Sequence, residues 1–237
     1  MTRSDYSPVT EKAGDWVTPE ALSMVYTRYR FAVDFCRGRR VLEVACGPGV
    51  GLGYLGRHAD GIVGGDLTDR LLLQAKRNLQ STRPLVRLQA EALPLHTASR
   101  DVIICYEALY FFEDAGKFLK ECRRVLAPPG VLLLRTVNPE WPEFNPNARS
   151  CRYYSARELA ALLREAGFQP DIFGAFSIAP ASIPAACLSW IKRVAVRLRL
   201  IPSSMAGKRV LKRLFLGKLV PFPAAVDEDM VVYAPPV

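Results

Sequence analysis

The sequence predicts an α/β fold in which parallel strands alternate with helices on both faces of one sheet. Short apolar, strand-like runs alternate with helix-like segments from Val41 through Ala166, and this order is typical of a parallel sheet wound with helices. The first run leads directly into a turn with glycine at positions 47, 49 and 51. Such folds bind their ligands where a strand passes through a turn into a helix.

The composition fits a single domain. The chain has 237 residues, half of them apolar, and a formal charge of +9, which is enough chain for one sizeable core. No charged region followed by an apolar run is evident at the N-terminus, so we expect a cytoplasmic protein. The six cysteines form no Cys-x-x-Cys pair, and His58 and His96 are the two histidines. We therefore expect free thiols and no metal site.

The glycine spacing excludes two common nucleotide-binding motifs. A dinucleotide fingerprint needs Gly-x-Gly-x-x-Gly directly after the strand, but the sixth position is Leu52 when counted from Gly47 and Tyr54 when counted from Gly49. A match at positions 51, 53 and 56 begins only after the strand has ended. A phosphate-binding loop needs a Gly-Lys-Ser/Thr sequence, which does not follow. The turn therefore brings peptide groups against a cofactor of another kind.

In order along the chain, four segments resemble the class I S-adenosylmethionine-dependent methyltransferases, in the branch that includes quinone, sugar and natural-product methyltransferases. The segments are residues 41–51, 61–66, 88–95 and 100–110. The resemblance implies a Rossmann-like, doubly wound sheet of seven strands, mostly parallel with an antiparallel last strand. The last two strands are expected over 171–178 and 230–234. The implied cofactor is S-adenosylmethionine.

The same resemblance implies which residues contact this cofactor. A carboxylate at Asp66 can accept hydrogen bonds from two ribose hydroxyls. Gln89 stands where the family often has Asp, and its amide can still meet the adenine amine. A helical cap over residues 1–38 is expected to bring Tyr26, Arg28 or Tyr29 to the methionine carboxylate. The full set expected at the cofactor is Tyr26, Arg28, Glu43, Ala45, Gly47, Gly49, Asp66, Leu67, Gln89, Ala90 and Glu91.

The implied reaction is an in-line displacement that holds the acceptor atom opposite the sulfur and excludes water. Glu107 and Tyr106 end the fourth strand and are the candidates to take the acceptor's proton or to orient the acceptor. Alternatively, only the backbone of Glu107 faces the cofactor. Residues 138–147 are too long for a plain turn and predict a lid. The side chains that wall the acceptor, or else pin this loop to the domain, are Tyr110, Trp141, Phe144 and Tyr153.

Positive charge gathers before the expected last strand. Residues 180–237 hold nine Lys and Arg against three acids, and residues 179–226 read as a basic helical insertion that faces the acceptor or a partner. The insertion is a solvated rim, a site for an anionic or carrier-linked acceptor, or a peripheral membrane contact. Residues 172–191 are uncharged, but prolines and a glycine interrupt them, which favours a strand and loop over a membrane span.

The sequence therefore predicts one metal-independent methyltransferase domain over residues 1–237, acting on a small-molecule or carrier-bound metabolite. A nucleic-acid substrate is the first alternative because the chain is basic. Against it, residues 105–108 lack the Asn/Asp-Pro-Pro-Tyr type of motif, and no RNA-binding module is evident. A non-catalytic, cofactor-binding partner subunit is the second alternative, and a nicotinamide-dependent reductase is the third.

Overall fold

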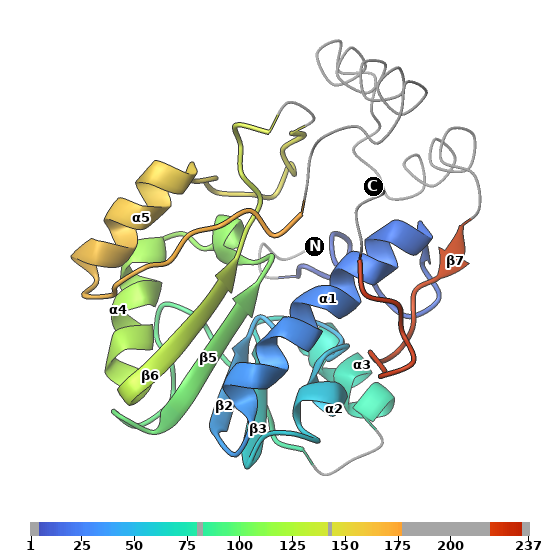
Figure 1. Cartoon of the computed structure of the whole chain (residues 1–237), viewed down its shortest axis with the longest axis horizontal. Helices are drawn as coiled ribbons and strands as arrows, with labels where there is room; N and C mark the ends of the chain where they lie inside the picture. Colours follow the sequence, from blue (N-terminus) through green and yellow to red (C-terminus); the bar gives the residue numbers. More distant parts are fainter. Residues whose placement is uncertain (1–4, 80–82, 142–143, 177–218, 234–237) are drawn as a thin grey trace.

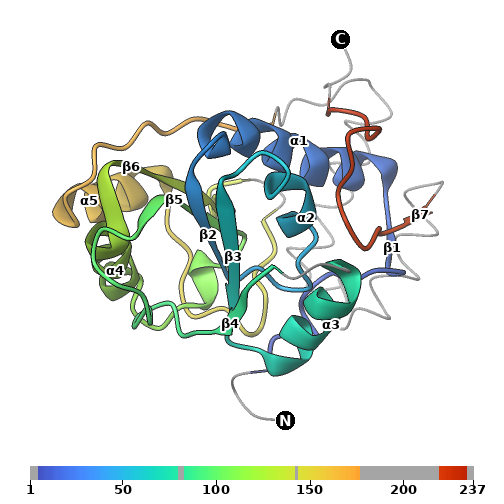
Figure 2. The ribbon, with the colours of Figure 1, turned by 90° about the horizontal axis from the view of Figure 1, so that it is seen from below.

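The computed structural model describes residues 5–79, 83–141, 144–176 and 219–233 of the chain. In this part, five strands form one parallel sheet in the order β4-β3-β2-β5-β6 (Figures 1 and 2). The strands are β2 (Arg40–Val44), β3 (Gly61–Asp66), β4 (Leu85–Arg87), β5 (Arg100–Tyr106) and β6 (Leu126–Arg135). The doubly wound, parallel arrangement predicted from the sequence is confirmed for these strands.

Helices cover both faces of this sheet. The helices α1 (Pro19–Cys36) and α2 (Leu52–Leu55) pack on one face, and α4 (Ala115–Val125) and α5 (Ala156–Glu165) pack on the other (Figure 1). The helix α3 (Asp69–Leu79) lies against β3 and β4, and a short 3₁₀ helix, η1 (Leu109–Phe111), follows β5. The expected cap region therefore contains a helix, α1, that packs against the sheet.

The strand residues alternate between two hydrophobic cores. In β2, Val41 contributes to the core beneath α1 and Leu42 to the core beneath α4, and in β5 Ile104 and Ile103 divide in the same way. All four side chains are fully buried. Burial on both faces explains why these strands read as continuous apolar runs rather than as alternating patterns.

The helix α5 (Ala156–Glu165) has a local sequence signal at each of its ends. The Ser155 side chain accepts a hydrogen bond from the Glu158 backbone, and the Glu158 carboxylate accepts one from the Ser155 backbone, which completes a capping box. At the other end Gly167 has φ of +85°, a conformation that glycine adopts at low cost. Local sequence was sufficient to predict both ends of this helix.

The described part of the chain does not show the two further strands. Residues 171–176 and 230–233 form no strand there, so the prediction of strands over 171–178 and 230–234 is wrong for the residues described. The cause is visible at Phe173, which is 65% exposed and packs its ring 5.8 Å from that of Phe31 on α1. The segment crosses toward α1 rather than pairing with β6.

Instead, a separate antiparallel pair joins the two ends of the described chain. The strand β1 (Trp16–Val17) pairs with β7 (Val220–Pro221) in a two-stranded sheet, and Figure 2 shows them side by side. After β7, the Val226 amide donates to the Val50 carbonyl at 2.8 Å. The C-terminal segment thus packs against α1 and the glycine turn.

Residues 177–218 lie outside the described part of the chain, and they include most of the basic insertion predicted over 179–226. The helical structure expected of this insertion therefore stays a prediction. Among the described helices, none is both long enough and apolar enough to cross a membrane.

Candidate active site

The strand order of the sheet reverses direction between β2 and β5. These are the first and the fourth strands of the sheet along the chain. In open α/β sheets, ligands bind at the carboxyl ends of the strands on either side of such a switch point. Two non-glycine residues with positive φ lie there: Ala45 after β2, at +56°, and Glu107 after β5, at +55°. Backbone strain of this kind is characteristic of functional sites.

The glycine turn is tied to the next strand by Asp66. This carboxylate is 5% exposed and accepts hydrogen bonds from the Gly47 amide at 2.9 Å and the Thr68 amide at 2.8 Å. Burial raises the pKa of Asp66 above its usual value, and the backbone hydrogen bonds oppose that rise. Asp66 therefore holds the turn in place, a role that the sequence did not reveal. Each oxygen retains capacity to accept a further hydrogen bond.

Glu43 is a buried acid on the α1 side of β2. Its Oε1 accepts a hydrogen bond from the Tyr29 hydroxyl at 2.8 Å. Its Oε2 is buried without a hydrogen-bond partner among the described residues. Burial raises the pKa of Glu43 to about 7, against the opposing effects of the Tyr29 hydrogen bond and the charge of Arg28. A buried carboxylate oxygen without a donor is costly unless a ligand supplies one.

Arg28 supplies the complementary unpaired group. Its Nε is buried without a partner among the described residues, and its charge acts on Glu43. The Tyr106 hydroxyl donates to the Arg28 carbonyl at 3.3 Å, so β5 and α1 hold one another here. Burial raises the pKa of Tyr106, which keeps its hydroxyl protonated at neutral pH. An unpaired donor and an unpaired acceptor thus lie near one another beside the switch point.

Glu107 takes part in a second polar cluster. Its carboxylate forms an ion pair with the Arg135 guanidinium and accepts a hydrogen bond from the Tyr110 hydroxyl at 3.3 Å. The Glu107 amide also donates to the Arg135 carbonyl at 2.9 Å. The side chains of Arg135 and Glu107 are about one quarter exposed, at 25% and 24%. The Glu107 side chain therefore contacts Arg135 and Tyr110, and its role toward a cofactor or an acceptor stays a prediction.

The expected acceptor wall is partly assembled. Tyr110 stacks on Tyr153 with ring centroids 4.9 Å apart, and Tyr153 meets Phe144 edge to face at 4.7 Å. The Tyr153 hydroxyl also accepts a hydrogen bond from the Asn147 amide, which pins the loop after β6. Trp141 is 40% exposed and has no ring contact with these three among the described residues. The structure brings together three of the four expected side chains.

Not every expected cofactor residue turns toward the switch point. The Tyr26 hydroxyl donates to the Glu228 carbonyl at 3.3 Å, and its ring lies 5.9 Å from that of Tyr54. Tyr26 therefore faces the C-terminal segment rather than Glu43. Its neighbour on α1, Tyr29, makes the contact with Glu43 instead.

The segment expected near the adenine lies beyond β4. Leu67 is half-buried, Gln89 is exposed, and Ala90 and Glu91 are buried. The Glu91 carboxylate accepts a hydrogen bond from the Glu113 amide at 3.0 Å. Glu91 therefore joins this segment to the loop before α4.

Sequence reasoning missed Arg135 and the N-terminal residues that cover the turn. The Tyr6 amide donates to Thr68 Oγ1 at 3.2 Å, and the Tyr6 ring lies 5.1 Å from that of Phe111. A Cβ on Gly47 would lie 3.3 Å from the Thr10 methyl group. A charged residue ending an apolar parallel strand was the available signal for Arg135. No comparable signal marks Tyr6 or Thr10.

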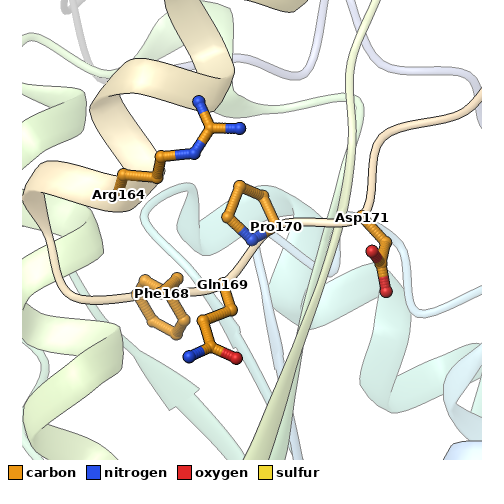
Figure 3. A pocket seen from close by; sticks show the side chains of 5 residues that line it. All are labelled: Arg164, Phe168, Gln169, Pro170 and Asp171. Atoms are coloured by element: carbon orange, nitrogen blue, oxygen red, sulfur yellow. The ribbon is translucent and has the colours of Figure 1, made fainter.

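Two features lie outside this region. A shallow hollow is lined by residues from α5 and the segment that follows it, namely Arg164, Phe168, Gln169, Pro170 and Asp171 (Figure 3). None of them comes from the carboxyl end of a strand. Across the described ranges, no three His, Cys, Asp or Glu side chains are grouped so that they could hold a metal ion.

Comparison with known proteins connects this geometry to a family. Residues 42–134, which run from β2 to the end of β6, match the family model described as a methyltransferase domain. A protein of Mycolicibacterium smegmatis, named as a probable S-adenosylmethionine-dependent methyltransferase, is 33% identical over 158 residues, which cover 62% of this chain and 59% of that protein.

Two further matches agree. The phthiotriol/phenolphthiotriol dimycocerosates methyltransferase 1 of Mycobacterium ulcerans is 38% identical over 133 residues, which cover 52% of this chain and 48% of that protein. The structure of an S-adenosylmethionine-dependent methyltransferase from Mesorhizobium loti aligns with a TM-score of 0.56 at 19% identity, over 68% of this chain and 88% of that one. The chain spans about half to three fifths of the length of the first curated relatives it matches.

Proposed function

We propose that this chain, through the methyltransferase domain that its residues 42–134 form, is an S-adenosylmethionine-dependent methyltransferase acting on a small organic acceptor. One observation carries the proposal. Glu43 Oε2 and Arg28 Nε are a buried acceptor and a buried donor, each without a partner among the described residues. They lie beside a glycine turn at the switch point of the sheet. A free amino acid group, with an ammonium and a carboxylate, would satisfy both.

The remaining cofactor contacts follow from the arrangement of the strand ends. The methionine end would lie between Glu43 and Arg28, and the ribose hydroxyls would reach the free lone pairs of Asp66. The peptide groups around the glycine turn would face the body of the cofactor, because glycine lets a ligand approach closely. The backbone contacts proposed are at Ala45, Gly47 and Gly49, and the adenine contacts are at Leu67, Gln89, Ala90 and Glu91.

S-Adenosylmethionine, when bound, supplies a methyl group on a positively charged sulfur, and an acceptor's lone pair takes that methyl as the carbon–sulfur bond breaks. The chain's own residues then have two tasks. Glu107 accepts the proton that an oxygen or nitrogen acceptor loses, or orients that acceptor through a hydrogen bond. Tyr106 stays protonated and holds α1 against β5, so that the two parts of the site keep their spacing.

The acceptor is proposed to be a small or carrier-linked molecule with a hydroxyl group. The M. ulcerans relative is named for the lipids phthiotriol and phenolphthiotriol, and further relatives from Coxiella burnetii are named as ubiquinone biosynthesis O-methyltransferases. These names support an oxygen acceptor. The aromatic group of Tyr110, Tyr153 and Phe144 supports an acceptor with an apolar or ring-shaped part.

Calorimetric binding tests the proposal. The wild-type protein and two variants are titrated with S-adenosylhomocysteine and with NAD. We expect micromolar binding of S-adenosylhomocysteine and no binding of NAD. Asp66→Ala should weaken that binding by about tenfold or more, because a lost hydrogen bond to a charged group costs roughly 1.5–3 kcal/mol.

Asp69→Ala is the matched control. Asp69 lies three residues farther on, is exposed and pairs with Arg87 at 3.4 Å, so its loss should leave binding unchanged. Thermal unfolding of Asp66→Ala checks that the variant is folded. If the protein bound NAD but did not bind S-adenosylhomocysteine, the proposal would be overturned in favour of a nicotinamide-dependent enzyme.

A further inference from the structure

Arg135 ends β6 at the carboxyl edge of the sheet and lies in a partly open position. Its side chain is 25% exposed, and one nitrogen, Nη1, contacts the Glu107 carboxylate. The guanidinium also lies 5.1 Å from the centre of the Phe176 ring. Its other nitrogens have no hydrogen-bond partner among the described residues. An arginine fork with five donors can bind a second carboxylate while it contacts the first.

The charged groups around Arg135 favour the binding of an anion. Burial lowers the pKa of Arg135 to about 10, and the nearby charge of Arg28 adds to this effect, so the Arg135 guanidinium is still charged at neutral pH. Under the proposed function, Arg28 binds the carboxylate of the cofactor and Glu43 binds the ammonium. Arg135 and Glu107 then balance one another, so an anion on the open donors of Arg135 would offset the positive charge that the cofactor brings.

We infer that Arg135 binds an anionic oxygen group, a carboxylate, on the methyl acceptor. This inference rests on the proposed function of the same site. The acceptor's carboxylate would lie on the open donors of Arg135, and its apolar part would lie near Phe176 and Tyr110. Glu107, which already contacts Arg135, would then face the acceptor atom from which it takes a proton. Arg135 is thus a substrate-binding residue that no sequence motif marks.

The shape of the cluster favours a planar acid. Arg135 and Tyr110 both contact Glu107. The acid group of the acceptor would therefore contact Arg135, and a ring next to that group would contact Tyr110. A neutral acceptor of the same shape would leave the charge of Arg135 with Glu107 as its one counter-charge. The expected preference is for an acid over its neutral amide, since hydrogen bonds to charged groups are the stronger ones.

Benzoate and benzamide test this inference, because they share a shape and differ in charge. Each is titrated calorimetrically into the protein saturated with S-adenosylhomocysteine. We expect benzoate to bind at least tenfold more tightly than benzamide. Arg135→Met should abolish this difference, whereas Arg135→Lys should retain part of it. Glu107→Gln should strengthen benzoate binding, because it removes the negative charge that competes for Arg135.

Arg40→Met is the control, since Arg40 begins β2 and pairs with Asp101 at 2.6 Å, at the amino ends of the strands and away from Arg135. It should leave both ligands unaffected. Equal binding of the two ligands, binding of neither, or an unchanged preference in Arg135→Met would overturn the inference. S-Adenosylhomocysteine binding is measured first for every variant and should be unchanged in Arg135→Met. Its absence from the wild type would count against the proposed function itself and not against Arg135 alone.

Discussion

Glu43 is the residue whose environment is most unusual for its type. It is 2% exposed and lies on the sheet face beneath α1, among apolar side chains. The sequence placed an acid within an apolar strand, and the resemblance assigned it to the cofactor. The sequence did not show that Tyr29, fourteen positions earlier, would hold one of its oxygens. Contacts between distant residues depend on how α1 packs on the sheet, and no local pattern encodes that packing.

We predict that Glu43 makes the ligand-free protein less stable as the pH rises. Its pKa in the folded state is about 7, above the ordinary value of 4.5, so the folded state holds the proton more strongly than the unfolded state does. The stability that this provides is present below about pH 4.5 and is lost as the pH rises to about 7. The expected loss is on the order of 2–3 kcal/mol.

Urea unfolding of the wild type and of Glu43→Gln between pH 4.5 and 8 measures this effect. Gln keeps the shape of the side chain and an acceptor for Tyr29 but does not titrate in this range. The variant should therefore lose the part of the pH dependence that the wild type shows up to pH 7. Identical pH profiles for the two proteins would contradict the assignment of this pKa to Glu43.

Among the elements, α2 and the glycine turn show how closely the backbone approaches its neighbours. A Cβ added to Gly51 would lie 1.9 Å from a ring carbon of Tyr29. Tyr29 is buried and holds Glu43, so it has no open space into which it can move. The third glycine of the turn is therefore required by packing against α1.

We predict that Gly51→Ala destabilises the protein by about 1–3 kcal/mol, the usual cost of overpacking a core. Gly53→Ala is the matched control, two residues farther on and inside α2, because its Cβ would meet nothing closer than a Leu79 atom at 3.7 Å. That change should be neutral or stabilising by up to about 1 kcal/mol, since alanine favours helix. Chemical denaturation compares the two. Equal effects from both substitutions would show that the clash with Tyr29 is relieved at no cost.

The elements that the sequence predicted correctly are those with local signals. The capping box of Ser155 and Glu158 and the positive φ of Gly167 lie at the two ends of α5, and these local signals indicate where it begins and ends. The parallel strands were predicted from apolar runs for the same reason. The ion pair of Glu107 with Arg135 joins neighbouring strands that are 28 residues apart in sequence. It could be inferred only once the two strands were known to be adjacent.

In the molecule as a whole, the two ends of the described chain close over one side of the sheet. The Gly14 amide donates to the Phe222 carbonyl at 2.9 Å, and the Tyr233 amide donates to Thr27 Oγ1 at 2.7 Å. Phe222 and Val226 are 4% and 1% exposed. The strands expected over 171–178 and 230–234 do not form in the described residues, and the chain ends meet through this contact instead.

We predict that Phe222→Ala destabilises the whole domain by about 3 kcal/mol, since it removes a buried ring from the core beneath α1. Phe173→Ala is the control, because Phe173 is 65% exposed; it should cost less than about 1 kcal/mol. Thermal unfolding of both variants provides the comparison. A small effect at Phe222 would mean that the C-terminal segment is not part of the cooperative core.

A crystal structure of the protein grown with S-adenosylhomocysteine would show whether the switch point of the sheet holds the cofactor. We predict that the ribose hydroxyls lie within hydrogen-bonding distance of Asp66. We also predict that the ammonium of the methionine end lies on Glu43 Oε2 and its carboxylate on Arg28 Nε. A ligand bound away from the glycine turn, or with its amino acid end away from Glu43 and Arg28, would contradict the proposed site.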